Sequence, residues 1–256
     1  MELSDFDKKC IELLKATPKR QSRHCFRSAI NHLERAEILF PVDSTMAVFR
    51  CYTAEEEAAS GLMHCLKELK YSNADKLNPR DHVQKNAVIQ FFSILSQFIE
   101  DRFREFGIEI SLLLVDNNGH NKLVFDVQMD MGNGLERFIP DPPLNFKLIH
   151  EEKRFSYKKQ IDTLINSRKV NEISKLLKNV ANQRNLLLYA TPEGYPSEIE
   201  ITDKFFLAYQ KRVLTLLRAY LLIQPYTEIQ PFVQDALDAF LSMLSKQKFE
   251  DLHDEF

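Results

Sequence analysis

The sequence predicts a mainly α-helical bundle that is interrupted near its middle by a small antiparallel β insertion. The 256 residues include only 6 glycines and 10 prolines, so residues that break helices are few. Over most of the chain, apolar residues recur at the i, i+3, i+4, i+7 spacing of amphipathic helices. Directly after Gly107 this spacing gives way to the alternation that is typical of β-strands.

The first two helices are expected at about residues 4–15 and 22–39. Pro41 ends the second helix because proline cannot continue the helical hydrogen-bond ladder. The apolar stripe of the second helix consists of Phe26, Ala29, Ile30, Leu33, Ala36 and Phe40.

Two more helices are expected before the insertion. The third covers about residues 44–69, and Asp43 or Ser44 caps it because a short polar side chain can accept a hydrogen bond from the first turn. Asn78 and Pro79 are expected to open the fourth helix, as its cap and first-turn residue.

The β insertion should form an antiparallel hairpin that lies outside the bundle. Residues 108–115 are apolar and rich in β-branched side chains, NNGH is a turn signal, and residues 123–129 alternate. A third strand is possible at residues 135–139, and the run PDPP closes the insertion at about Pro143.

Helical periodicity returns after the insertion. It predicts helices at about residues 151–166, 170–189, 202–222 and 227–245.

The predicted domain organisation is one bundle with an insertion. Residues 1–107 and 147–245 supply the helices of the same bundle, and residues 108–146 form the β-rich insertion. Residues 246–256 are expected to be a flexible acidic tail.

The charge balance and the expected lack of signal and membrane segments limit the classes of function. The 34 Lys and Arg residues stand against 37 Asp and Glu residues, and this formal charge of -3 provides no general attraction to nucleic acid or anionic lipid. Any RNA binding would therefore be local. The N-terminus MELSDFDKKC lacks an apolar signal region, and no stretch approaches the roughly 18 apolar residues of a membrane span, so we expect a cytoplasmic protein with no membrane partner.

The four cysteines are widely spaced, and none forms a Cys-x-x-Cys pair. They are expected to be small core residues of a reduced compartment. They are Cys10, Cys25, Cys51 and Cys65.

Two charged residues interrupt apolar helix stripes, namely Glu55 and Arg184. A buried charge needs a partner, so these two side chains are expected to lie on facing helices or around one shared polar pocket. In one interpretation they form a structural ion pair. In the other, Arg184 with Asn185 faces a phosphate, while Glu55 or Glu56 orients the arginine. The two interpretations are compatible.

The segment VANQRNLLLYATPEG resembles the signature helix of the HEPN superfamily, in which an Arg and a polar residue are followed after a few positions by a His. Here the pattern begins with Arg184 and Asn185 and ends at Tyr189. The segments SAINHLERAEILF and AVFRCYTAEEEAASGLMHCLKEL resemble the early helix pair of the superfamily, especially in abortive-infection proteins of the AbiV type. Glu55 and Glu56 match the acidic positions of that helix pair. The segment DHVQKNAVIQFF, which contains His82 and Lys85, adds a further similarity, and the resemblance covers about residues 22–106 and 151–245.

The resemblance implies a helical bundle that often dimerises so that two Arg-bearing helices face each other. It also implies metal-independent RNA cleavage, in which the His transfers a proton and the Arg binds the phosphate. In this chain Tyr189 occupies the position of the His, and a tyrosine, with a pKa of about 10, is a poor general base at neutral pH. We therefore expect cleavage by this chain alone to be weak or absent, whereas phosphate binding by Arg184 is retained.

No metal or cofactor is expected. The carboxylates of Glu55, Glu56 and Glu57 point about 100° apart around a helix and cannot converge on one cation. His82, in the first turn of a helix, is a surface or capping residue or, in the functional interpretation, a residue that orients the site. The basic residues near the C-terminal helices are expected to be a solvated face, and they are Lys204, Lys211, Arg212 and Arg218.

Together these features favour a HEPN-like protein that binds or targets RNA or a nucleotide in a prokaryotic defence or toxin–antitoxin system. The expected partners are a second copy of the chain, in a homodimer, and a cognate defence or antitoxin protein, and the protein would be a metal-independent endoribonuclease if active. The alternative is a non-catalytic helical interaction module, in which the same residues are structural and the β insertion supplies the partner surface.

Overall fold

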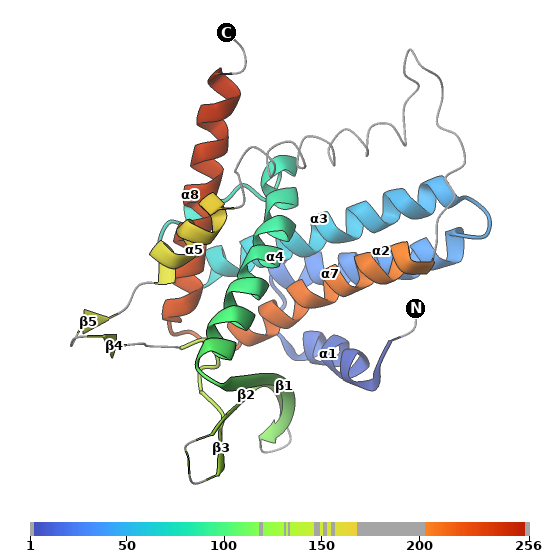
Figure 1. Ribbon diagram of the computed structural model, residues 1–256. Helices are drawn as coiled ribbons and strands as arrows, with labels where there is room; N and C mark the ends of the chain where they lie inside the picture. The colour runs from blue at the N-terminus through green and yellow to red at the C-terminus, as the bar shows by residue number, and fades with distance from the viewer. Residues whose placement is uncertain are drawn as a thin grey trace.

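The computed structural model describes residues 3–117, 120–130, 132, 134–145, 149–150, 153–154, 157–167 and 203–253. Within these ranges the protein is mainly helical with a small three-stranded antiparallel sheet, which confirms the predicted fold class (Figure 1). The predicted helix at residues 170–189 lies outside the described residues. The same holds for Arg184, Asn185 and Tyr189, which it contains.

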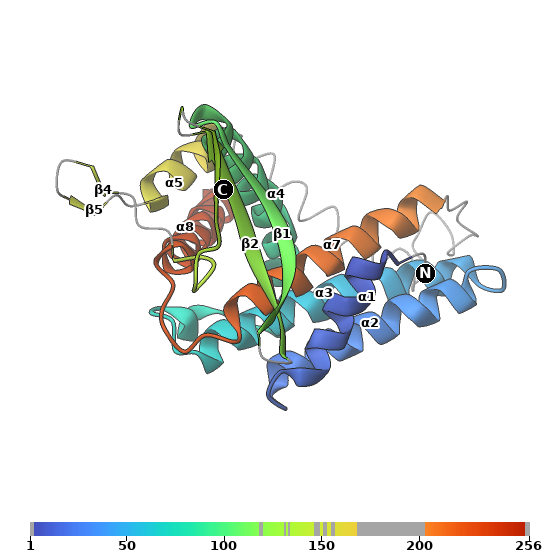
Figure 2. The same cartoon turned by 90° about the horizontal axis from the view of Figure 1, so that it is seen from below.

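Helices α2 (Gln21–Leu39), α3 (Ser44–Glu68) and α7 (Asp203–Ile223) lie side by side and form one layer of the bundle (Figures 1 and 2). Helix α1 (Asp5–Ala16) packs against α2 and α7. The predicted cap of α3 is confirmed, since the Asp43 carboxylate accepts a hydrogen bond from the Met46 amide at 2.8 Å.

Helices α4 (His82–Glu105), α5 (Tyr157–Ser167) and α8 (Pro231–His253) cross the first layer steeply (Figure 1). Helix α8 continues to His253, eight residues beyond the predicted end, so part of the predicted flexible tail is helical. Helix α4 begins later than predicted and after the short 3-10 helix η1 (Ala74–Lys76).

The sheet has the order β1–β2–β3, with β1 at Ile108–Asn117, β2 at His120–Asp130 and β3 at Leu135–Phe138. Adjacent strands are antiparallel, and the long β1–β2 ribbon extends from the end of α4 toward α1 (Figure 2). This confirms the predicted hairpin and its third strand.

A second, two-stranded pairing joins β4 (Ile149–His150) to β5 (Lys153–Arg154). The prediction that a helix starts at about Glu151 was therefore wrong, and α5 starts only at Tyr157. The amide of Tyr157 donates a hydrogen bond to the Asp235 carboxylate of α8 at 2.9 Å, which fixes this helix start by a contact that is distant in sequence.

The hairpin belongs to the core and does not lie outside the bundle, which corrects the prediction. Leu123 is 1% exposed, and Leu112 and Phe125 pack against the same hydrophobic core as the helices. The physical reason is that alternation gives the ribbon one apolar face, and burying that face against the helices removes it from water. All four cysteines are buried and free, as predicted.

Candidate polar site between helices α3, α4 and α7

Helix α3 carries two adjacent buried carboxylates, Glu55 and Glu56. Each residue is only 7% exposed. Because consecutive residues point about 100° apart around a helix, each carboxylate meets a different neighbouring helix. Glu55 faces α7 and Glu56 faces α4, so the site has two halves.

In the first half, Glu55 accepts a hydrogen bond from Nε of Arg212 on α7. The Arg212 guanidinium lies 4.1 Å from the ring centroid of Tyr209, and Tyr52 meets that ring edge-on at 5.4 Å. A stacked, ion-paired arginine presents its charge in a fixed direction. The expected partner Arg184 lies outside the described residues, so the proposed pairing of Glu55 with Arg184 stays a prediction.

The surroundings of Glu55 raise the affinity of its carboxyl group for a proton. Burial raises the pKa of Glu55 from 4.5 to about 7, because the charge and hydrogen bond of Arg212 offset only part of the lost hydration, and the Glu56 charge opposes ionisation further. Burial also raises the pKa of Tyr209, and the nearby Glu55 charge adds to this effect. Glu55 can therefore exchange a proton near neutral pH, a property that is more common in functional sites than in ordinary cores.

In the second half, Glu56 receives two donors from the first turn of α4. Lys85 Nζ donates to Glu56 Oε2 at 3.1 Å, and His82 Nδ1 lies 2.8 Å from Glu56 Oε1. Lys85 is buried, whereas the His82 side chain is 49% exposed. Since Glu56 serves as a carboxylate acceptor for the ammonium group, we infer that Nδ1 carries the proton of the His82 ring.

The start of α4 is what places His82 and Lys85. The Asp81 carboxylate caps the helix by accepting from the amides of Val83 and Gln84, at 2.9 and 3.3 Å. His82 is then the first helical residue, and Lys85 lies three residues later on the same side.

Two of the four basic residues predicted to be solvated are ion-paired instead. Arg212 holds Glu55, and Arg218 holds Asp7 of α1 while its guanidinium lies 5.5 Å from the Phe6 ring. Each is partly buried. Lys204 and Lys211 are exposed, as predicted.

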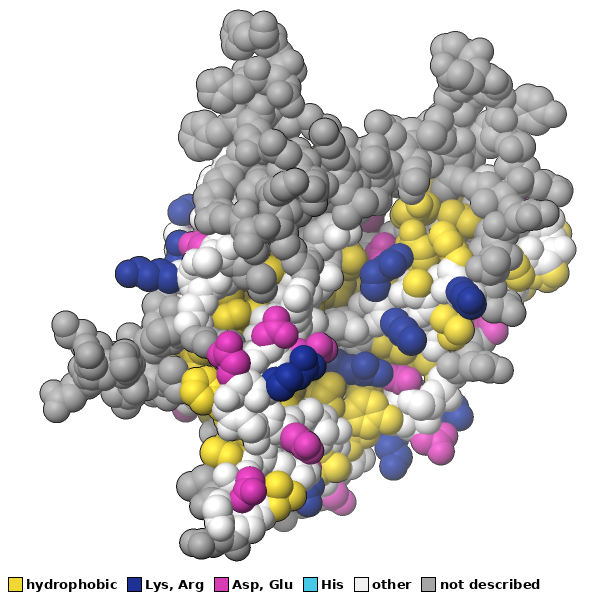
Figure 3. All heavy atoms as spheres, viewed as in Figure 1, with side chains coloured by type: hydrophobic (Ala, Val, Ile, Leu, Met, Phe, Trp, Pro, Cys, Tyr) yellow, Lys and Arg dark blue, Asp and Glu magenta, His cyan; other side chains and the backbone are white. Residues whose placement is uncertain are grey.

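The sequence could have shown that Arg212 is a charge within an apolar stripe and needs a partner, although not which partner. Arg212 follows Tyr209 by three residues and precedes Leu216 by four, so it occupies the same helical stripe as these two core residues. Arg212 is therefore a charged residue within an apolar helix stripe, the same pattern that indicated Arg184. Lys and Arg side chains gather near α7 on the face shown in Figure 3, mixed with acidic and hydrophobic side chains rather than in a continuous basic stripe.

Neither a metal site nor a membrane helix is found in the parts of the chain that the structure describes. No group of three or more His, Cys, Asp or Glu side chains could hold a metal ion among the described residues. Within the same ranges, none of the helices combines the length and apolar character needed to cross a bilayer.

Comparisons with known proteins add no relatives. No protein-family model matches the chain, and no curated protein or solved structure matches it either.

Proposed function

We propose that this chain is a HEPN-like, RNA-binding component of a prokaryotic defence or toxin–antitoxin system, with the Glu56–His82 pair as its proton-transfer group. The observation that carries the proposal is the half-exposed imidazole of His82, bonded through Nδ1 to a buried carboxylate. That carboxylate, Glu56, is one of the two acidic positions that the resemblance singles out.

The pair suits metal-independent phosphodiester chemistry. With its proton on Nδ1, a neutral His82 ring has its lone pair on Nε2, which can accept the proton of a ribose 2′-hydroxyl. The 2′-oxygen then attacks phosphorus, the bond to the 5′-oxygen breaks, and the leaving oxygen takes a proton from the imidazolium. His82 would thus perform the step for which Tyr189 is unsuited, while Arg184 and Asn185 hold the phosphate.

Binding and cleavage of labelled single-stranded RNA in the presence of a metal chelator test the proposal. We expect binding that weakens at least tenfold in Arg184→Ala, together with slow cleavage that is lost in His82→Gln while binding is kept. His24→Gln, which changes an exposed histidine on α2, is the matched control and should cleave as the unmodified chain does. Cleavage that survives His82→Gln contradicts the role of His82, and absence of RNA binding contradicts the proposal as a whole.

Two further variants separate the roles of the residues. Glu56→Gln should lower kcat with little change in KM and displace the pH profile, because the imidazole loses the charged acceptor that orients it. Tyr189→His should raise cleavage if the segment that carries Arg184 contributes to the site. A Glu56→Gln variant with an unchanged pH profile would mean that Glu56 is only structural.

The second candidate function is a non-catalytic interaction module. It is favoured by exposed apolar side chains on and after the edge strand β3. Leu135 is 66% exposed, and Phe138 and Ile139 are also exposed on and directly after the terminal strand β3. Apolar side chains on such a strand are typical of surfaces that bind another chain. If the chain binds no RNA and Phe138→Lys converts a dimer to a monomer in light scattering, this function replaces the first.

A further inference from the structure

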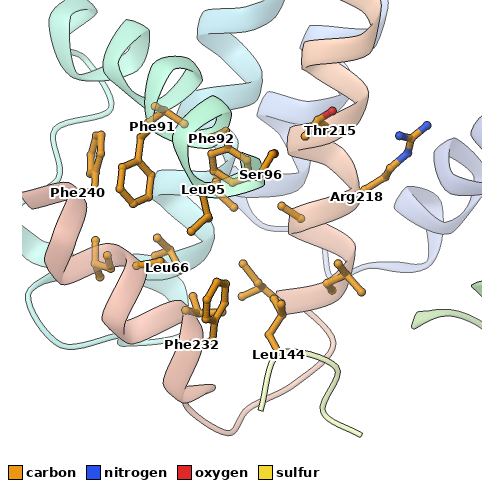
Figure 4. Close-up of a pocket in the computed structure, with 18 of the residues that line it drawn as sticks. Leu66, Phe91, Phe92, Leu95, Ser96, Leu144, Thr215, Arg218, Phe232 and Phe240 are labelled. Carbon is orange, nitrogen blue, oxygen red and sulfur yellow. The ribbon is translucent and has the colours of Figure 1, made fainter. Parts of the chain in front are cut away.

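A second feature lies away from the polar site, namely a partly open apolar cavity of about 280 Å³ lined by residues of α3, α4, α7, α8 and the hairpin (Figure 4). None of Glu55, Glu56, His82, Lys85 and Arg212 lines it. Its walls are formed almost entirely by aliphatic and aromatic side chains, which include Leu66, Phe91, Leu95, Leu144, Phe232 and Phe240.

The cavity offers no charge to an occupant. Its polar lining residues are Ser96, Thr215 and Arg218. Figure 4 shows the guanidinium group of Arg218 directed away from the cavity, and this group is bonded to Asp7. The hydroxyl of Thr215 donates to the Lys211 carbonyl at 2.8 Å, so at most weak hydrogen bonding remains at this end.

The size of the cavity argues that it is more than a packing defect. Protein interiors are packed as densely as organic crystals, with few voids larger than a water molecule. A hollow of this size with apolar walls leaves apolar surface in contact with solvent, and a ligand that covers this surface gains free energy. Water would find few hydrogen-bond partners against these walls. A precedent is an engineered apolar cavity of about 150 Å³, which remains dry and binds benzene.

An occupant can enter from the side of the cavity formed by α4, α7 and the hairpin. The hairpin lining residues Leu112 and Phe125 and several lining residues of α4 and α7 are partly or fully exposed, whereas the lining residues of α3 and α8 are buried. On α4 and α7, the partly or fully exposed lining residues are Phe92, Ser96, Ile99, Thr215, Arg218 and Ala219.

We propose that this cavity binds a neutral, largely apolar small molecule of about the volume of two fused aromatic rings, or an alkyl chain of equal volume. The volume is nearly twice that of the benzene-binding cavity. The uncharged walls exclude an ionised ligand because no group replaces its hydration.

Naphthalene is a suitable probe, and naphthalene-2-sulfonate is its charged counterpart. Naphthalene should bind the full chain saturably, at one molecule per chain by calorimetry, and raise the Tm. The sulfonate at the same concentration should do neither. Absence of saturable naphthalene binding, or equal binding of both compounds, overturns the proposal.

A pair of variants on α7 locates the binding. Ala219→Leu places a larger side chain in the cavity and should weaken naphthalene binding at least tenfold, while Ala208→Leu, at a partly buried position outside the lining, should leave it unchanged. Ser96→Leu changes an exposed position at the entrance and provides a second test if Ala219→Leu fails to fold. Unchanged affinity in both lining variants shows that the probe binds elsewhere and overturns the assignment.

Discussion

At the residue scale, Glu55 is a buried carboxyl group, and burial disfavours its ionised form. Its pKa of about 7 in the folded protein exceeds 4.5, the ordinary value expected in the unfolded chain. The folded state therefore holds a proton that the unfolded state releases between about pH 4.5 and 7. Stability from this group is fully present below pH 4.5 and is lost as the pH rises through about 7.

The corresponding prediction concerns Glu55→Gln, which removes the charge and keeps the shape. From pH 4.5 to 7.5, the free energy of unfolding of the unmodified chain should fall relative to that of the variant by up to about 3 kcal/mol. Urea unfolding across this range measures the difference. Glu12→Gln, at an exposed position of α1, is the control, and parallel pH curves for Glu55→Gln and the unmodified chain would show that Glu55 does not titrate in this range.

Gly61 gives a second prediction at the residue scale. In a helix, Ala is favoured over Gly by about 1 kcal/mol, so propensity alone predicts that Gly61→Ala stabilises the protein. In the structure, a Cβ at this position would lie 2.7 Å from Cδ2 of Phe26 and 3.1 Å from the Ser22 carbonyl oxygen. Phe26 is fully buried and cannot move aside cheaply.

We therefore expect Gly61→Ala to lower the free energy of unfolding by about 1–3 kcal/mol, as overpacking does. Thermal or urea unfolding measures it. In a Phe26→Leu background the same change should cost less, because the ring that blocks the new methyl group is gone. Equal losses in both backgrounds would mean that the ring is not the cause.

At the element scale, the start of α4 shows how competing local signals are resolved. Asn78 and Pro79 are acceptable first-turn residues by sequence, yet Asn78 makes a turn in which its side chain accepts from the Arg80 amide. Its own amide donates to the Gln84 side chain at 2.8 Å, and the Pro79 carbonyl accepts from Ser60 of α3 at 3.2 Å. These bonds hold residues 78–80 in a turn, so Asp81 is the N-cap residue of α4.

The hairpin yields a prediction at the same scale. Leu123 on β2 is buried among the helices, whereas Leu135 on β3 is exposed. Leu123→Ala should lower the free energy of unfolding by about 2–5 kcal/mol through the cavity that it leaves, and Leu135→Ala should change it by less than about 0.5 kcal/mol. Urea unfolding of the two variants compares them directly. A small effect of Leu123→Ala would restore the original prediction that the hairpin lies outside the bundle.

At the scale of the whole molecule, Gln230 joins segments that are far apart in sequence. Its side chain accepts from the Leu144 amide at 2.8 Å and donates to the Leu222 carbonyl at 3.1 Å. Its backbone amide donates to the hydroxyl of Tyr71. Gln230 is fully buried, so these bonds fix the end of the insertion against α7 and the start of α8 without competition from water.

Gln230→Met should therefore cost about 2–5 kcal/mol, because it leaves a buried amide and a buried carbonyl without partners. Gln234 is a close control. Its side chain also makes two backbone bonds, both to Ser72, but in an exposed position where water can replace them. We expect Gln234→Met to change the free energy of unfolding by less than about 1 kcal/mol in the same urea experiment, and equal effects of the two changes would contradict this explanation.

The sequence by itself determined the periodic features of this protein. Amphipathic stripes located the helices, the change of period after Gly107 located the hairpin, and Asp43 identified a cap, because each depends only on residues that are close in the chain. The tertiary structure alone decided that Arg212 is the partner of Glu55, that the hairpin joins the core, and that four helices and the hairpin line an apolar cavity. These features arise between segments that are distant in sequence, so their energies depend on how the helices pack, and no local pattern specifies that packing.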